Sequence, residues 1–152
     1  FRALDDPQAR LLVAGHAHQP AYAAAIETQA SRDARVRLLL RHVPDDELQF
    51  FFQASDACLL PYRAATTSGA ALLALSFGCP IVAPRLGPFP ELAAAGRGLL
   101  FDPDNVDDLA RALRLTPSRD RLAAQAACLA YAQSLAWPTL AQRHLAAYQA
   151  HR

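Results

Sequence analysis

The sequence contains no lysine and no methionine. All of its basic residues are arginine, and 15 of them against 14 acidic residues give a formal net charge of +1 at pH 7. The absence of lysine excludes a Schiff-base lysine and the lysine of a phosphate-binding P-loop. The balanced charge gives no electrostatic basis for binding nucleic acid.

Cysteines and long apolar runs are also scarce. The three cysteines, Cys58, Cys79 and Cys128, lie far apart in apolar surroundings and form no C-x-x-C motif. They are typical of buried thiols in a reducing compartment rather than of a disulfide framework. The longest apolar run, residues 70–83, is interrupted by glycine and proline, so we expect no membrane span. These features favour a cytoplasmic location, with peripheral attachment at the inner membrane face as a further option.

The 152 residues suffice for one domain with a buried core, and a hydrophobic content of 53% with 19% charged residues is typical of a globular domain. The chain starts at Phe1 without an initiator methionine or a signal-peptide pattern. We therefore expect residues 1–152 to form a single, incomplete domain from a longer two-domain chain.

Short apolar runs alternate with helical segments along the whole chain. Strands are expected at residues 9–14, 36–40, 57–60, 80–83 and 98–101, and helices at residues 20–31, from 44 onward, 68–77, 89–95, from the cap at 102–105 to about 114, 118–135 and 137–151. This alternation predicts an α/β fold, a Rossmann-like parallel sheet with helices on both faces. Each expected strand is a continuous apolar run, which is typical of parallel strands that are buried on both faces of the sheet. Phe50, Phe51 and Phe52 are expected to face the sheet, and Trp137 to anchor the last helix.

Ligands of such sheets bind beyond the carboxyl ends of the strands, where the expected strands of this chain are followed by polar loops. One of these loops contains His16 and His18. Two histidines at this spacing could begin a metal site, but the sequence places no third ligand beside them. We interpret them as part of a polar loop and predict no metal.

The most informative loop contains Thr66, Thr67, Ser68 and Gly69, directly before an alanine-rich helix. A helix start carries free N–H groups and partial positive charge, so this loop could hold a phosphate without any lysine. The alternative is mechanical, because hydroxyl residues are also ordinary helix N-caps. The loop alone leaves both interpretations open.

The loop at residues 66–69 is part of a longer motif that covers three stretches of the sequence. These are residues 56–91, residues 98–113, and Trp137 with the helix that ends at Tyr148. In this order they resemble the group 1 (family 4) glycosyltransferases. The resemblance implies the carboxyl-terminal, donor-binding half of a GT-B fold. That half would lack its first strand, which would lie upstream of Phe1.

The resemblance also implies functional residues, which fall into three groups. The donor diphosphate would be bound by Thr66, Thr67, Ser68, Gly69, Ala70 and Ala71 with help from Arg63, the nucleobase by His42 and Val43, and Gly15, Arg85 and Glu91 would lie in loops on the donor side. The acceptor site and any catalytic base would come from the missing amino-terminal domain, so no catalytic residue is assigned. The family uses a nucleotide-sugar donor, here a UDP- or GDP-sugar, without a metal or other cofactor.

The sequence departs from the family at two positions. The family usually carries two glutamates separated by seven residues, and the corresponding positions here are Ala65 and Leu73. Either the hydroxyl and glycine loop replaces the glutamate pair, with Arg63 or Arg85 as the cation, or the domain is a non-catalytic relative in which Leu73 is a core residue. The retained loop favours the active variant.

The expected function is transfer of a sugar from the nucleotide donor to a glycan or lipid-linked acceptor in polysaccharide assembly, usually with retention of anomeric configuration. The fragment alone is expected to be inactive. Two other classes stay open: a non-catalytic glycosyltransferase-like nucleotide-binding or interaction module, and an epimerase of nucleotide sugars that shares the fold.

Overall fold

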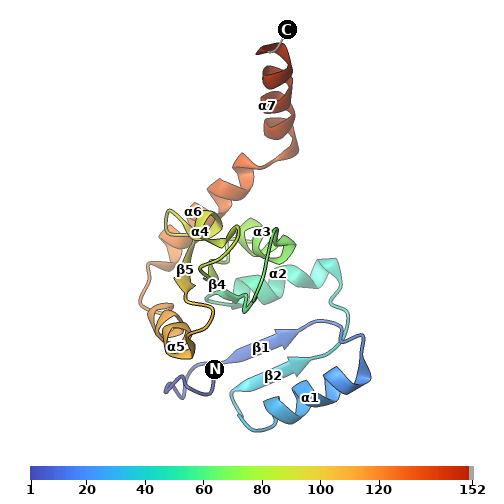
Figure 1. Ribbon diagram of the computed structural model, residues 1–152, viewed down its shortest axis with the longest axis vertical. Helices are drawn as coiled ribbons and strands as arrows, with labels where there is room; N and C mark the ends of the chain where they lie inside the picture. Colours follow the sequence, from blue (N-terminus) through green and yellow to red (C-terminus); the bar gives the residue numbers. More distant parts are fainter. Residues whose placement is uncertain (151–152) are drawn as a thin grey trace. The chain divides into compact units, whose positions relative to one another are not determined.

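The structure, a computed structural model, describes residues 1–150. The chain divides into two compact units, one formed by residues 1–50 and the other by the residues from Phe51 onward. Each unit contains a parallel sheet with its own helices (Figure 1). Among the described residues, no helix is long and apolar enough to cross a membrane.

The first unit is built from β1 (Leu11–Ala14), α1 (Pro20–Ala30) and β2 (Val36–Leu39). The two strands are parallel, and their register pairs Leu11 with Val36 at one end and Ala14 with Leu39 at the other. α1 starts with proline, whose fixed φ and missing N–H suit the first helical position. α2 (Asp45–Ala54) carries the chain into the second unit. Its first turn holds three acidic residues, which are favourable at the positive end of a helix.

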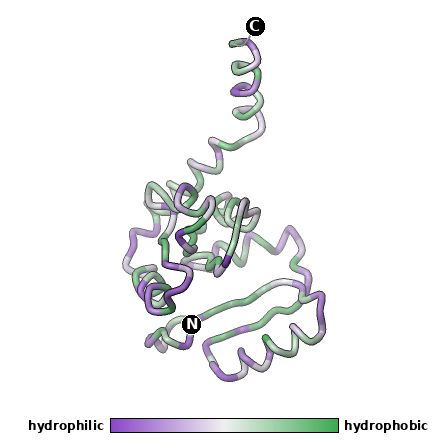
Figure 2. Tube along the Cα trace, in the orientation of Figure 1, coloured by the Kyte–Doolittle hydropathy of each residue, from purple (hydrophilic) through white to green (hydrophobic). Residues whose placement is uncertain are grey.

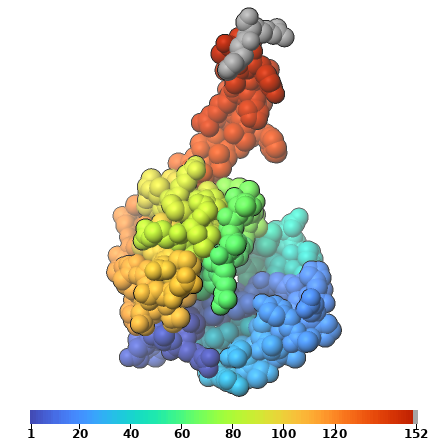
Figure 3. All heavy atoms as spheres, viewed as in Figure 1, coloured from blue at the N-terminus to red at the C-terminus, as the bar shows by residue number. Residues whose placement is uncertain are grey.

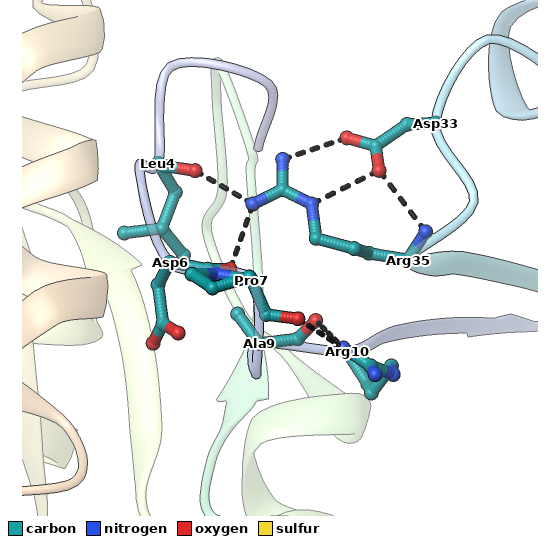
Figure 4. A network of polar contacts seen from close by, with 7 residues as sticks. All are labelled: Leu4, Asp6, Pro7, Ala9, Arg10, Asp33 and Arg35. Atoms are coloured by element: carbon teal, nitrogen blue, oxygen red, sulfur yellow. Dashed lines mark hydrogen bonds and ion pairs between the residues drawn. The ribbon is translucent and has the colours of Figure 1, made fainter.

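Arg35 fixes the segment before β1 to the start of β2 (Figure 4). Its Nη1 donates hydrogen bonds to the carbonyl oxygens of Leu4 (2.6 Å) and Asp6 (2.9 Å). The same guanidinium pairs with Asp33 at 2.8 Å and lies over the ring of Phe1. The hydrogen bond from Arg35 lowers the pKa of Asp33 to about 2.

The second unit has the parallel strands β3 (Cys58–Leu59), β4 (Ile81–Pro84) and β5 (Gly98–Phe101), in the order β3-β4-β5. Its helices are α3 (Gly69–Ser76), α4 (Phe89–Ala93), α5 (Val106–Leu115), α6 (Arg121–Ser134) and α7 (Trp137–Ala150). The hydropathy colouring shows how charged residues alternate with apolar ones along α5 (Figure 2). This pattern is typical of a helix with one face on a sheet.

Two apolar clusters lie on opposite faces of the β3–β4–β5 sheet, because successive residues of β4 point to opposite sides. Ile81 and Ala83 belong to the larger cluster, which includes residues of α3, α4 and α6. Val82 belongs to the smaller cluster, with Phe101 and residues of α5. All four residues of β4 are buried, so this strand has helices on both faces, as a central parallel strand should.

The expectation of one continuous sheet is not met in the described residues, where β1 and β2 form one sheet and β3, β4 and β5 another. The expectation that all strands are buried runs is also wrong for β1. It alternates half-buried and exposed residues, and Leu12 is 47% exposed, because the sheet has only two strands.

Two expectations about aromatic residues are wrong. Phe50 does not face the sheet but is 63% exposed, whereas Phe52 stacks on Phe77 with ring centres 5.4 Å apart. Trp137 does not anchor the last helix, since it is 85% exposed and α7 has no buried residue. Figure 3 shows the atoms of α7 standing clear of the rest of the second unit. A helical apolar pattern predicts a face that can pack, but not that its partner is present.

Candidate functional site

The loop between β3 and α3 ends in a side-chain cap. Ser68 has an extended backbone, and its Oγ accepts a hydrogen bond from the N–H of Ala71 at 3.2 Å. The side chain of Ser68 is buried, with 5% of the residue exposed. The mechanical interpretation of this hydroxyl therefore holds: Ser68 is the N-cap of α3.

The cap does not use the N–H groups of the first two residues of α3, Gly69 and Ala70. These two residues, with the preceding Thr66 and Thr67, are called the mouth of α3 below. In the part of the chain that the structure describes, Gly69 and Ala70 donate to no protein acceptor, and both residues are exposed. A Cβ built on Gly69 would meet nothing within 4 Å, so the space in front of this backbone is free. Thr66 and Thr67 are exposed beside it. The mouth thus offers backbone donors, hydroxyls and the positive end of a helix dipole.

The loop before α3 packs against the loop after β4, which the sequence did not predict. Gly87 has φ +52°, and a Cβ at this position would overlap the carbonyl oxygen of Ala65. Nearby, the rings of Tyr62 and Phe89 lie 5.6 Å apart. Two loops that follow neighbouring parallel strands are therefore held together at the same edge of the sheet.

The two candidate cations of these loops differ in their surroundings. Arg63 is exposed and has no hydrogen-bond or ion-pair partner within residues 1–150. Arg85 is also exposed, but its charge acts on Asp108 of α5, where it adds to the stronger effect of Arg111 in lowering the pKa of that carboxyl. Neither side chain has a hydrogen bond or ion pair within the described residues, so both are available to a ligand.

Glu91 is held by residues that sequence reasoning missed. Arg97 is buried and donates from Nη2 to the carbonyl oxygen of Glu91 at 2.6 Å and from Nε to that of Leu92 at 2.9 Å. Its guanidinium lies over the ring of Tyr131, 4.1 Å from the ring centre. Burial, followed by the charge of Glu91, raises the pKa of Tyr131. These contacts join α4 to α6.

The two positions that lack the family glutamates have different surroundings. Ala65 is half-buried and packs against the larger core cluster. Leu73 is half-buried and belongs to neither cluster of buried residues, so the interpretation of this leucine as core is not supported. From Ala57 to Pro90 the sequence contains no acidic residue at all.

The remaining predicted residues lie in the first unit. Gly15 follows β1, and its N–H donates to the carbonyl oxygen of Leu39 at 3.1 Å. His42 follows β2, and its carbonyl oxygen accepts a hydrogen bond from Nη1 of Arg41 at 2.9 Å. Val43 is half-buried next to it. The predicted residues thus form two groups, one at the strand ends of each unit.

The cysteines offer no nucleophile at ordinary pH. Burial raises the pKa of Cys58 to about 11, that of Cys79 to about 12 and that of Cys128 to about 11. All three are free thiols that pack in or against the core. Within the described residues, no group of three or more His, Cys, Asp or Glu side chains could hold a metal ion.

The sequence profile of the family described as "Glycosyl transferases group 1" matches residues 1–116. The chain belongs to the group 1 glycosyltransferases. The resemblance stated from the sequence motifs is thereby confirmed, and the matched residues include both groups of predicted site residues.

A curated protein that is similar to this chain is a GDP-mannose:glycolipid 4-beta-D-mannosyltransferase from Xanthomonas campestris pv. campestris. It is 34% identical to this chain over 84 residues, which are 55% of this chain and 24% of the relative. The chain therefore matches about a quarter of that protein's length.

Solved structures of GT-B glycosyltransferases share the fold. Sucrose-phosphate synthase from Thermosynechococcus elongatus matches with a TM-score of 0.78 and 22% identity, over 97% of this chain and 39% of its own. Anabaena HepE, solved in complex with UDP, matches with a TM-score of 0.75 and 21% identity, over 95% of this chain and 42% of its own. This glycosyltransferase chain thus corresponds to one half of a GT-B enzyme.

Proposed function

We propose that this chain is the donor-binding part of a glycosyltransferase, which holds a nucleotide-diphosphate sugar for transfer to a glycan or lipid-linked acceptor. The single observation that carries the proposal is the open mouth of α3. Within residues 1–150 the N–H groups of Gly69 and Ala70 donate to no acceptor, both residues are exposed, and the side-chain side of Gly69 is free. Membership of the glycosyltransferase group gives this mouth a ligand class.

The charges around the mouth suit a diphosphate. The helix dipole places about half a positive charge at the start of α3. Arg63 adds a full charge on an exposed side chain that has no partner among the described residues, and its planar fork can bind two phosphate oxygens at once. No carboxylate between residues 57 and 90 opposes them. The same groups would stabilise the leaving diphosphate as negative charge builds on it during transfer.

The proposed division of roles follows the structure of the loop. Ser68 fixes the first turn of α3 through its cap, while the N–H groups of Gly69 and Ala70 and the hydroxyls of Thr66 and Thr67 contact phosphate. Glu91 and Arg85 border the donor from the loop after β4. In the first unit, we propose that Gly15 and the backbone of His42 and Val43 lie on the donor and nucleobase side. The carbonyl oxygen of His42 accepts one hydrogen bond, from Arg41, and its N–H donates to no acceptor within residues 1–150.

GDP-mannose is the first donor to test, because the curated relative from Xanthomonas is named for GDP-mannose and a glycolipid. We propose that the activity needs the rest of a longer chain, including an amino-terminal domain, and acts at the cytoplasmic side of a membrane in polysaccharide assembly. Retention is the family's usual outcome and is part of the proposal. The relative's name specifies a β-linked product, so the anomeric configuration of product and donor should be compared directly by NMR.

The decisive experiment is a titration of the chain with GDP, UDP and ADP, followed by backbone amide NMR. The expected result is selective shifts of the amides of residues 66–71 with one of the three nucleotides. The variant Ala70→Pro removes one proposed donor at a position where proline is tolerated, in the first turn of a helix. It should weaken binding without unfolding α3.

Leu122→Pro is a matched control. Leu122 is the second residue of α6, and the next residue is capped by Asp120 in the same way that Ala71 is capped by Ser68. This variant should leave nucleotide binding unchanged. Equal binding by all three proteins, or shifts elsewhere, would remove the mouth of α3 from the site.

The other two classes are separated by assays on the full-length protein. A non-catalytic module would bind nucleotide without consuming donor. An epimerase would convert the sugar nucleotide without an acceptor, whereas the proposed transferase releases GDP or UDP only in proportion to glycosylated acceptor.

A further inference from the structure

Two histidine side chains that the proposed function does not use face each other in the loop between β1 and α1. The Nδ1 atoms of His16 and His18 are 3.2 Å apart, and both side chains are exposed to solvent. The rings are nearly perpendicular, with an interplanar angle of 81° and ring centres 4.6 Å apart. In Figure 1 this loop follows the arrow of β1.

The distance between the nitrogens fits a shared metal ion. Zinc binds histidine nitrogen at about 2.0–2.1 Å. Two such bonds that span 3.2 Å meet at an angle of roughly 100°, which lies between octahedral and tetrahedral coordination. The separation of the two nitrogens is therefore already that of a two-nitrogen chelate.

The two rings already interact through the nitrogens that a metal ion would use. The 3.2 Å between the Nδ1 atoms is a hydrogen-bond distance, with the donor and acceptor roles set by the tautomers, and the rings are at an angle of 81°. A metal ion bound between the same two nitrogens would take the place of this hydrogen.

The backbone holds the loop at both ends. The N–H of Gly15 donates to the carbonyl oxygen of Leu39, which extends the β1–β2 ladder up to the loop. On the other side, the carbonyl oxygen of Gln19 accepts hydrogen bonds from Tyr22 and Ala23 in the first turn of α1. Only three residues lie between these fixed points, so the backbone that carries both histidines is short and held at each end.

We propose that His16 and His18 form a bidentate surface site for a divalent transition-metal ion such as Zn²⁺, Ni²⁺ or Cu²⁺, bound through both Nδ1 atoms. Each ring is then neutral and carries its proton on Nε2, so binding to the neutral pair moves a proton within one ring and releases none. Water or ligand oxygens complete the coordination. Mg²⁺ and Ca²⁺ are excluded, because they prefer oxygen ligands.

The first test is calorimetric titration of the chain with Zn²⁺ in the absence of nucleotide. One ion should bind per chain. Replacement even of groups behind metal ligands weakens affinity by 10–100-fold, so loss of a ligand in His16→Gln or His18→Gln should raise the Kd by about tenfold or more. His42→Gln and His144→Gln, which change other exposed histidines, are matched controls and should leave the Kd unchanged.

A second measurement needs no variant. Paramagnetic Ni²⁺ or Cu²⁺, added below one equivalent, should broaden the amide signals of residues 14–19 first, and Mg²⁺ should change none of them. Unchanged Zn²⁺ affinity in both His16 and His18 variants, or first broadening around another histidine, would overturn the proposal. Because no nucleotide is present, this result is independent of whether the mouth of α3 binds a diphosphate.

Discussion

Replacement of Gly87 by alanine should destabilise the second unit more than any ordinary glycine-to-alanine change. Gly87 combines two constraints: a φ of +52°, which side chains other than glycine rarely adopt, and a backbone carbonyl, that of Ala65, in the space of the missing Cβ. The obstacle is main chain, so no change of rotamer can relieve it. One of the two loops has to move.

The magnitude follows from these two constraints. The left-handed backbone costs roughly 1–2 kcal/mol for a residue with a Cβ. Overpacking against fixed neighbours adds about 1–3 kcal/mol. We expect a loss of about 2–5 kcal/mol in the free energy of unfolding, which lowers the Tm of a domain of about 100 residues by roughly 10 °C or more.

Gly69→Ala is the matched control on the neighbouring loop. Gly69 has no atom within 4 Å of an added Cβ and is not among the residues with positive φ. This change should be neutral or stabilise by about 0.5–1 kcal/mol, because alanine loses less backbone entropy in a helix. Thermal unfolding followed by circular dichroism compares both variants with the parent. A Gly87→Ala protein as stable as Gly69→Ala would refute the packing of the two loops described above.

Three further predictions concern the cap, the acid pair and the buried thiols. Ser68→Ala removes the cap of α3 and should cost about 1 kcal/mol in urea unfolding; an unchanged midpoint would show that the Ser68–Ala71 hydrogen bond contributes nothing. Because Arg35 lowers the pKa of Asp33 from 3.8 to about 2, the pair stabilises the fold above pH 4, and this stability should decline as the pH falls from about 4 to 2. Asp33→Asn should lack that part of the decline in urea midpoints, whereas parallel curves would contradict it. Cys79 and Cys128 are buried, with pKa values raised to about 12 and about 11, so a thiol reagent at pH 8 should modify them only as the protein unfolds; fast reaction in native buffer would contradict this burial.

The helices and strands could be predicted from the sequence because their signals are local. The strand at 98–101 was predicted with the bounds that the structure has, and the others agree within a few residues. Proline at the start of α1 and the Asn105 cap of α5 mark helix starts through groups within a turn of each other. Such signals need no knowledge of the remaining chain.

The pairing of the strands and the packing partners of the apolar side chains could not be predicted from such local signals. The separation of the strands into two sheets depends on which strands lie side by side, and no local pattern encodes that. The exposure of Trp137 has the same origin, since an apolar side chain does not specify what covers it.

The candidate site shows the same limit. Its loops were located from the rule that ligands bind at strand ends, and the cap at Ser68 from its side-chain type. The contact of Gly87 with Ala65 and the stacking of Arg97 on Tyr131 join residues that are distant in sequence. A glycine followed by proline signals a turn, but it does not identify the carbonyl that the turn will meet.

The absence of the two family glutamates changes the charge around the mouth of α3. Loss of both carboxylates leaves residues 57–90 with Arg63 and Arg85 and no negative charge. The hydroxyl of Ser68 is already used as a cap, so phosphate recognition would rest on backbone N–H groups and arginine. In the proposed site, the absence of two carboxylates would remove repulsion of a diphosphate, but it would also remove acceptors for sugar hydroxyls. If the proposed site binds a nucleotide sugar, selectivity for the sugar and the ribose must then come from groups outside residues 57–90.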